Sequence, residues 1–82
     1  MNSPQVPPSL RELLADVFEI SPEEVTPELS SATLETWDSF RHLQAVLALE
    51  GEYGVQLDPQ RVPELTTVAL LQAELEKKGV SL

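Results

Sequence analysis

The stretch ETWDSFRHLQAVLALEGEYGV, residues 35–55, contains the strongest helix signal in the chain. Asp38 is a preferred N-cap residue, and Gly54 can take the left-handed conformation at which helices commonly end. Together they predict a helix from Ser39 to Tyr53. The run AVLAL within it is apolar on nearly every side, which is typical of a helix packed on more than one side. We expect its main buried face to contain Phe40, Leu43, Val46 and Leu47.

One further helix is predicted on each side of this central one. The first spans residues 9–19 and begins with a capping box formed by Ser9 and Glu12. The last spans residues 66–78, begins at Thr66 as N-cap and ends in two lysines and a glycine, as the helix dipole and the C-cap favour. The expected buried positions are Leu10, Leu13, Leu14, Val17 and Phe18 in the first helix, and Val68, Leu71 and Leu75 in the last.

The connections between these helices differ in length. A long proline-containing loop follows the first helix, and its spaced apolar residues are expected to anchor it to the core: Ile20, Val25, Leu29 and Leu34. A short helical turn is predicted at LDPQRVPEL, with Asp58 as cap and Pro59 at the first helical position. No segment has a convincing strand pattern. The predicted fold class is therefore all-α, a three- to four-helix bundle with a long loop between the first two helices.

Length and composition narrow the possible functions. The chain has 82 residues, which is one small domain and argues against an enzyme with an active-site cleft. Its net charge of −9 repels nucleic acid and anionic membranes, and favours a basic surface on a partner protein. Cysteine is absent, no apolar run is long enough for a membrane span, and no signal peptide is evident. We expect a cytoplasmic monomer with a flexible N-terminal tail at residues 1–8, a folded domain at 9–79 and a short C-terminal end at 80–82.

Ser39 is the main candidate for a functional side chain. It stands at the first position of the central helix, where backbone N–H groups lack intrahelical partners and the helix dipole is positive. A phosphate ester at this position would be stabilised by the helix end itself. Asp38 is expected to cap the helix whatever the function. A purely structural role for Ser39, in helix initiation, is the alternative that position alone leaves open.

Asp38, Ser39 and His42 contain every side chain type of a hydrolase triad, and serine and histidine three residues apart on a helix can approach one another. A working triad also needs an oxyanion hole and a binding pocket, which the sequence does not indicate. We interpret His42 as a solvated surface histidine and Trp37 as a large side chain that covers the end of the bundle. The acidic pairs have no metal-binding spacing, so no metal site is predicted.

The order of these elements resembles the acyl carrier protein family over residues 9–79. The resemblance is carried by an Asp-Ser pair that opens the central helix in "DSF" and by "ALEGEYGV" at its end. It implies an acyl-carrier type of bundle and covalent phosphopantetheine, derived from coenzyme A, on Ser39. It also implies a second role for Asp38, in recognition by the phosphopantetheinyl transferase.

Such a carrier holds an acyl or aminoacyl group as a thioester and presents it to loading and downstream enzymes of fatty acid or secondary metabolite biosynthesis. In the family, an apolar seam between the later helices can open to shelter an acyl chain. A D-alanyl carrier remains possible, and a peptidyl carrier is disfavoured because aspartate and not glycine precedes Ser39. The alternative from another class is a small acidic helical adaptor that binds partners without a prosthetic group.

The run "WDSFRHL" is similar to stand-alone carriers of specialised pathways, and it departs from the acidic second helix of fatty-acid carriers. Arg41 places a positive charge within about one turn of Ser39. We therefore expect a dedicated partner with a neutral or acidic docking surface, because like charges at an interface are costly.

Overall fold

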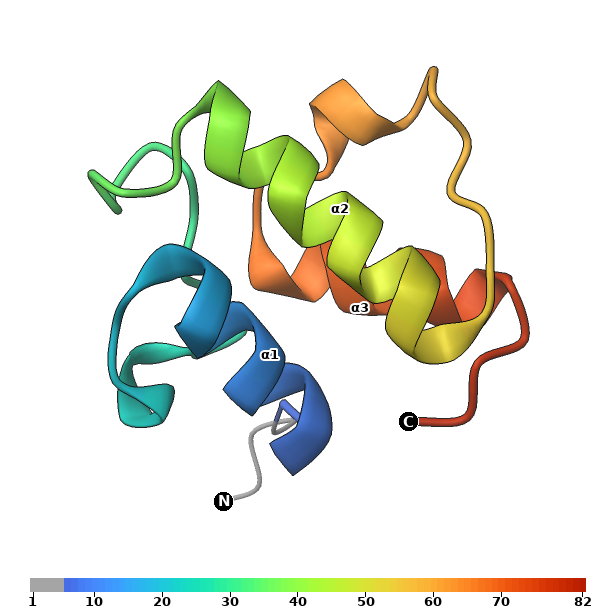
Figure 1. The fold of residues 1–82 in the computed structure, drawn as a ribbon, viewed down its shortest axis with the longest axis horizontal. Coiled ribbons are helices and arrows are strands. Elements are labelled where there is room, and N and C mark those ends of the chain that lie inside the picture. Colours follow the sequence, from blue (N-terminus) through green and yellow to red (C-terminus); the bar gives the residue numbers. More distant parts are fainter. Residues whose placement is uncertain (1–5) are drawn as a thin grey trace.

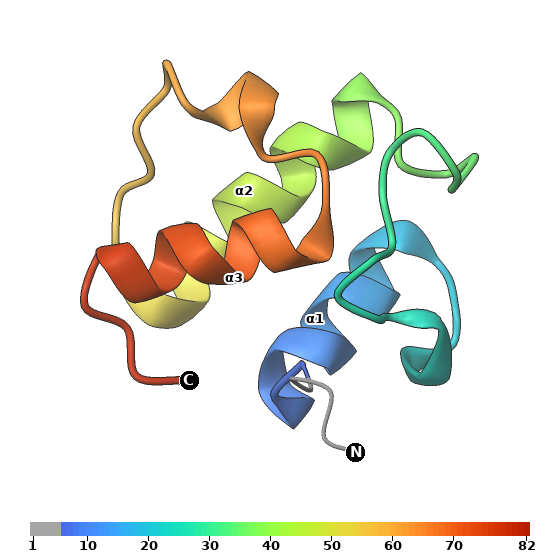
Figure 2. The same ribbon diagram turned by 180° about the vertical axis from the view of Figure 1, so that it is seen from behind.

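The computed structural model describes residues 6–82, which form three α-helices and two short 3₁₀-helices (Figure 1). In chain order these are α1 (Pro8–Phe18), η1 (Pro22–Glu24), α2 (Ser39–Tyr53), η2 (Val62–Glu64) and α3 (Val68–Lys77). Helix α2 crosses in front of α3 in Figure 1 and behind it in Figure 2, and α1 lies beside them. The only β-type pairing within residues 6–82 is an isolated bridge between Ser30 and Thr67. The predicted all-α bundle with a long first loop is confirmed.

The predicted bounds of α2 are confirmed at both ends. The carboxylate of Asp38 accepts a hydrogen bond of 2.9 Å from the backbone N–H of Arg41. Gly54 adopts φ = 66°, the left-handed conformation that ends the helix. Both ends of α2 therefore follow from local chemistry, and Ser39 is placed at its first position.

The predicted N-caps of the outer helices, Ser9 and Thr66, are wrong. Helix α1 begins at Pro8, because proline has the φ angle of a first turn and lacks the N–H that would need a cap. The hydroxyl of Ser9 lies 3.1 Å from that of Tyr53 instead. Helix α3 is capped by Thr67, whose hydroxyl accepts the N–H of Leu70.

The chain on either side of the bundle packs against it. Val6 is buried, so folded structure begins ahead of residue 9; residues 1–5 of the predicted tail lie outside the described residues. Val80 and Leu82 pack against the core after α3. In the long loop Val25 is buried, and the other three predicted anchors, Ile20, Leu29 and Leu34, pack against the core. The prediction that this loop is anchored is confirmed. None of the helices within residues 6–82 has the length and apolarity needed to cross a bilayer.

In the segment before η2, the predicted roles of Asp58 as helix cap and of Pro59 as first helical residue are wrong. The carboxylate of Asp58 accepts the backbone N–H of Gln60 at 2.9 Å. The segment after Pro59 is a turn, and helical structure starts only at Val62. A second proline, Pro63, lies inside the short 3₁₀-helix, which needs few backbone donors.

The predicted buried face of α2 is largely wrong. Phe40, Leu43 and Leu47 are 67%, 55% and 67% exposed. Helix α2 instead buries Ala45, Val46 and Leu49 against the other helices. These two sets lie on nearly opposite sides of a helix with 3.6 residues per turn. The core is completed by Leu10, Leu14, Ala15 and Phe18 of α1, by Leu57 and Leu65, and by Val68, Leu71 and Leu75 of α3.

The two adjacent threonines before α3 provide a test of its cap. Thr67→Ala removes the acceptor of the Leu70 N–H and should lower the free energy of unfolding by about 1 kcal/mol. Thr66→Ala is the matched control, because the Thr66 side chain is exposed and has no hydrogen bond within residues 6–82. Urea unfolding followed by circular dichroism compares the two. Equal losses in both variants would contradict the assignment of Thr67 as the cap.

Candidate functional site

Ser39 is exposed at the first position of α2. The Asp38 carboxylate bonds the N–H of Arg41, and the Asp38 carbonyl accepts the N–H of His42. The N–H groups of Ser39 and Phe40 have no partner within residues 6–82. An anion attached to the Ser39 hydroxyl would therefore meet unpaired donors and the positive end of the helix dipole.

Trp37 holds in place the loop segment that leads into Ser39. Its side chain is only 3% exposed and stacks on Phe18, with ring centroids 4.4 Å apart. The hydroxyl of Thr36 donates a 2.7 Å hydrogen bond to the Phe18 carbonyl. The prediction that Trp37 covers the end of the bundle is confirmed, and the loop is held to the end of α1 directly before Ser39.

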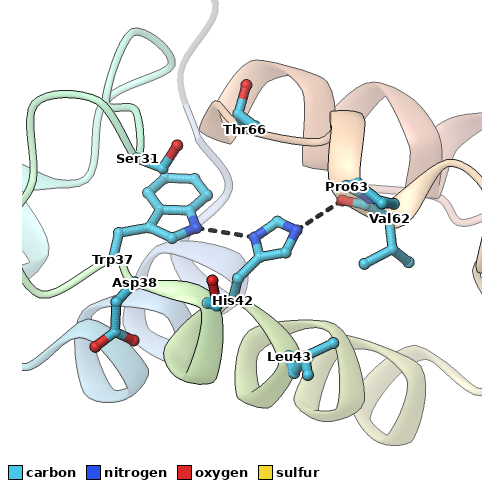
Figure 3. A pocket seen from close by; sticks show the side chains of 9 residues that line it. Ser31, Trp37, Asp38, His42, Leu43, Val62, Pro63 and Thr66 are labelled. Atoms are coloured by element: carbon cyan, nitrogen blue, oxygen red, sulfur yellow. Dashed lines mark hydrogen bonds between the residues drawn. The ribbon is translucent and has the colours of Figure 1, made fainter.

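The interpretation of His42 as a solvated histidine is wrong. The Trp37 indole N–H donates to His42 Nδ1 at 2.9 Å, and His42 Nε2 lies 2.7 Å from the Val62 carbonyl oxygen (Figure 3). The side chain is half-buried. Both ring nitrogens are occupied, so neither is available to take a proton from Ser39. The geometry therefore argues against the hydrolase triad that the sequence contains.

Arg41 does not present an unpaired charge beside Ser39. Its guanidinium lies 3.1 Å from the Glu19 carboxylate and donates a 2.6 Å hydrogen bond to the Val17 carbonyl. The side chain is 27% exposed. Arg41 thus joins α2 to the end of α1, and the expectation that it directs a positive charge toward partner proteins is corrected.

A groove of about 560 Å³ opens beside Ser39, between α2 and η2 (Figure 3). Its lining consists of Ser31, Trp37, Asp38, Ser39, His42, Leu43, Val62, Pro63 and Thr66. The walls are mostly apolar. The hydroxyls of Ser31 and Thr66 have no hydrogen-bond partner within residues 6–82 and are available to a bound group.

The family resemblance implied an apolar seam between the later helices, but sequence reasoning did not identify Ser31, Thr66 or the role of His42. Ser31, Thr66 and η2 come from loops whose position depends on tertiary contacts. The pair Trp37 and His42 did carry a usable signal. The first residue precedes the cap and the second lies one turn into the helix, so both side chains can reach the same side of the helix start. No group of metal-ligating residues occurs within residues 6–82.

The contact between Arg41 and α1 can be separated into its two parts. Glu19→Gln removes an ion pair whose carboxylate is exposed, and should cost well under about 1 kcal/mol, less still at high salt. Arg41→Met also removes the donor to the Val17 carbonyl and should cost about 1–2 kcal/mol. Urea unfolding at low and high salt measures both. A loss in Arg41→Met that disappears at high salt would mean that the ion pair alone matters.

Comparison with known proteins places these features in a family. No family model matches the chain. The chain is 32% identical over 68 residues to "Acyl carrier protein" from Thermosynechococcus vestitus, which covers 83% of this chain and 84% of the relative. It is 39% identical over 67 residues to "Polyketide-8 synthase acyl carrier protein 2" from Streptomyces avermitilis, covering 82% and 74% of the two chains. The chain therefore belongs to the acyl carrier protein family, and it is a carrier protein and not an enzyme.

Proposed function

We propose that this protein carries an acyl or aminoacyl group as a thioester on a phosphopantetheine arm attached to Ser39. The observation that supports the proposal is the exposed position of Ser39 as the first residue of α2, behind the Asp38 cap and beside a groove. The relatives named acyl carrier protein support a carrier role in general. The proposed partners are a phosphopantetheinyl transferase, a loading enzyme and downstream biosynthetic enzymes.

The residues around Ser39 fit such an arm. Attachment would replace the hydroxyl hydrogen of Ser39 with the pantetheine phosphate of coenzyme A, releasing a proton and the adenosine bisphosphate portion. The resulting phosphodiester carries one negative charge, for which the N–H groups of Ser39 and Phe40 are available. When bound, the arm supplies a terminal thiol that holds the cargo as a thioester. The groove offers apolar walls and the hydroxyls of Ser31 and Thr66 to a group held beside Ser39.

The exposed apolar residues of α2 support contact with partner enzymes. Phe40, Leu43 and Leu47 repeat at helical spacing from the residue next to Ser39. Since Arg41 is paired with Glu19, we propose that partners recognise this apolar stripe (Phe40, Leu43 and Leu47) and not an arginine charge. We further propose that the protein acts as a monomer in the cytoplasm. The adaptor alternative would use the same stripe, but without any modification of Ser39.

Modification of the purified chain tests the attachment site. Incubation with coenzyme A and a broad-specificity phosphopantetheinyl transferase should add one phosphopantetheinyl group per chain, observed by intact mass. Ser39→Ala should abolish the addition and leave helicity unchanged. Ser31→Ala is the matched control, because Ser31 also lines the groove. The Ser31→Ala chain should still be modified at Ser39. An unmodified native chain would favour the adaptor, and a modified Ser39→Ala chain would exclude Ser39 as the site.

A second substitution separates the two roles of Asp38. Asp38→Asn should retain the cap, because asparagine caps a helix about as well as aspartate. If the carboxylate contacts the transferase, kcat/KM for modification should fall by about tenfold, the effect of losing one hydrogen bond to a charged group. Asp58→Asn is the control, since it makes the same charge change at another aspartate whose carboxylate accepts a backbone N–H, in the turn before η2. Equal rates for the native protein and Asp38→Asn at low salt would leave Asp38 with the cap alone.

A further inference from the structure

His42 links the loop before α2 to the wall of the groove opposite that helix. The indole N–H of Trp37 is 2.9 Å from His42 Nδ1, and His42 Nε2 is 2.7 Å from the carbonyl oxygen of Val62, the first residue of η2. The Trp37 and His42 rings are nearly parallel, at 22°, with centroids 6.0 Å apart. Figure 3 shows the imidazole between the indole and η2.

The partners determine the tautomer of the imidazole. An indole N–H can only donate and a carbonyl oxygen can only accept. Nδ1 of His42 therefore accepts from Trp37, and Nε2–H donates to the Val62 carbonyl. Both bonds form only in this state, so the Trp37–His42–Val62 hydrogen-bond chain has one consistent direction.

The rest of η2 is held mainly at its two ends. Arg61, directly before η2, lies 3.4 Å from the buried carboxylate of Glu74, which is 4% exposed. Leu65, directly after it, is 1% exposed in the core. Between these anchors, Pro63 is exposed and Val62 is only half-buried. Val62 packs against the core, and the hydrogen bond from His42 adds the polar side-chain contact that ties the start of η2 to α2.

Both partners of this hydrogen bond, His42 and Val62, line the groove. Val46 follows His42 by one turn on the same face of α2, and it is buried. The groove is lined by Ser39, His42 and Leu43 on one side and by Val62 and Pro63 on the other. A chain fixed at Ser39 that entered the core along this face would have to separate η2 from α2, and so break the bond from His42 to Val62.

We propose that His42 determines the size of the acyl group that this protein shelters, by tying η2 to α2 and closing the groove toward the core. The inference rests on the proposed attachment at Ser39. With the bond intact, the protein accommodates short acyl groups in the groove and leaves longer chains exposed to solvent. His42 is a positioning residue in this proposal, acting through η2.

Two conservative variants separate the bonds of His42. In His42→Asn the side-chain amide reaches the position of Nδ1, so it can still accept from Trp37 but cannot reach Val62. In His42→Gln the amide reaches the position of Nε2 and can still donate to Val62. Gln44→Asn, at an exposed position of the same helix, controls for the helix propensity of asparagine.

The first readout needs no arm or cargo. In the unmodified chain, amide hydrogen exchange of Val62, Glu64 and Leu65, followed by NMR, should speed up by roughly two- to tenfold in His42→Asn. It should stay close to the native rate in His42→Gln and in Gln44→Asn. Unchanged exchange in a folded His42→Asn chain would overturn the role of His42 in holding η2.

The second readout measures size selection directly. The transferase attaches arm and cargo together from acetyl-, butyryl-, hexanoyl- or octanoyl-coenzyme A, and intact mass follows thioester cleavage by hydroxylamine. In the native protein and His42→Gln, the octanoyl thioester should be cleaved at least as fast as the shorter ones. In His42→Asn it should survive roughly two- to tenfold longer, with the acetyl thioester unchanged.

The outcomes distinguish the two proposals. If the native octanoyl thioester is already protected, or if the length profiles of all variants coincide, the inference about His42 fails while the attachment to Ser39 stands. If the native chain takes up no arm from any acyl-coenzyme A, the proposed function fails, and the size selection fails with it.

Discussion

The burial of Trp37 is the constraint on which the candidate site depends. The indole stacks on Phe18 at the end of α1 and donates its N–H to His42 at the start of α2. An aromatic side chain of this size removes a large apolar area from water, and the position of its backbone is then narrowly defined. Because Asp38 and Ser39 follow directly, the cap and the serine are placed by the same contact. A long loop with only weak anchors would not place them as closely.

The packing of α2 explains why its apolar residues divide into two sets. Ala45 allows a neighbouring helix to approach closely, while Val46 and Leu49 fill the core. Phe40, Leu43 and Leu47 then lie in water, although exposing three large apolar side chains on one helix favours association. The net charge of −9 opposes self-association through long-range repulsion. One apolar side of α2 thus packs in the core, and the other is exposed and available for contact with other proteins.

Sequence reasoning succeeded at the ends of α2, where the signal is local, although it missed the N-caps of α1 and α3, and it failed where structure depends on distant partners. Asp38 and Gly54 act on the nearest turn of backbone, and both ends of α2 were predicted correctly. The run AVLAL has no unique period, so its buried side could not be read from spacing. The carbonyl groups that accept hydrogen bonds from Arg41 and His42 lie 24 and 20 residues away, beyond the reach of any helical pattern.

Around the proposed attachment site, side chains donate hydrogen bonds to backbone carbonyls. The hydroxyl of Thr36 and the guanidinium of Arg41 donate to the carbonyls of Phe18 and Val17, which lie in the last turn of α1 and lack intrahelical partners.

His42 donates in the same way to the Val62 carbonyl of η2. Side chains thus satisfy three carbonyl oxygens near the start of α2, and these side chains fasten α1, α2 and η2 to one another. The first two N–H groups of α2 are left unpaired within residues 6–82. Because acceptors are satisfied and donors are free, this end of the bundle is suited to a negatively charged group on Ser39, and the contacts that hold it together need not break to admit one.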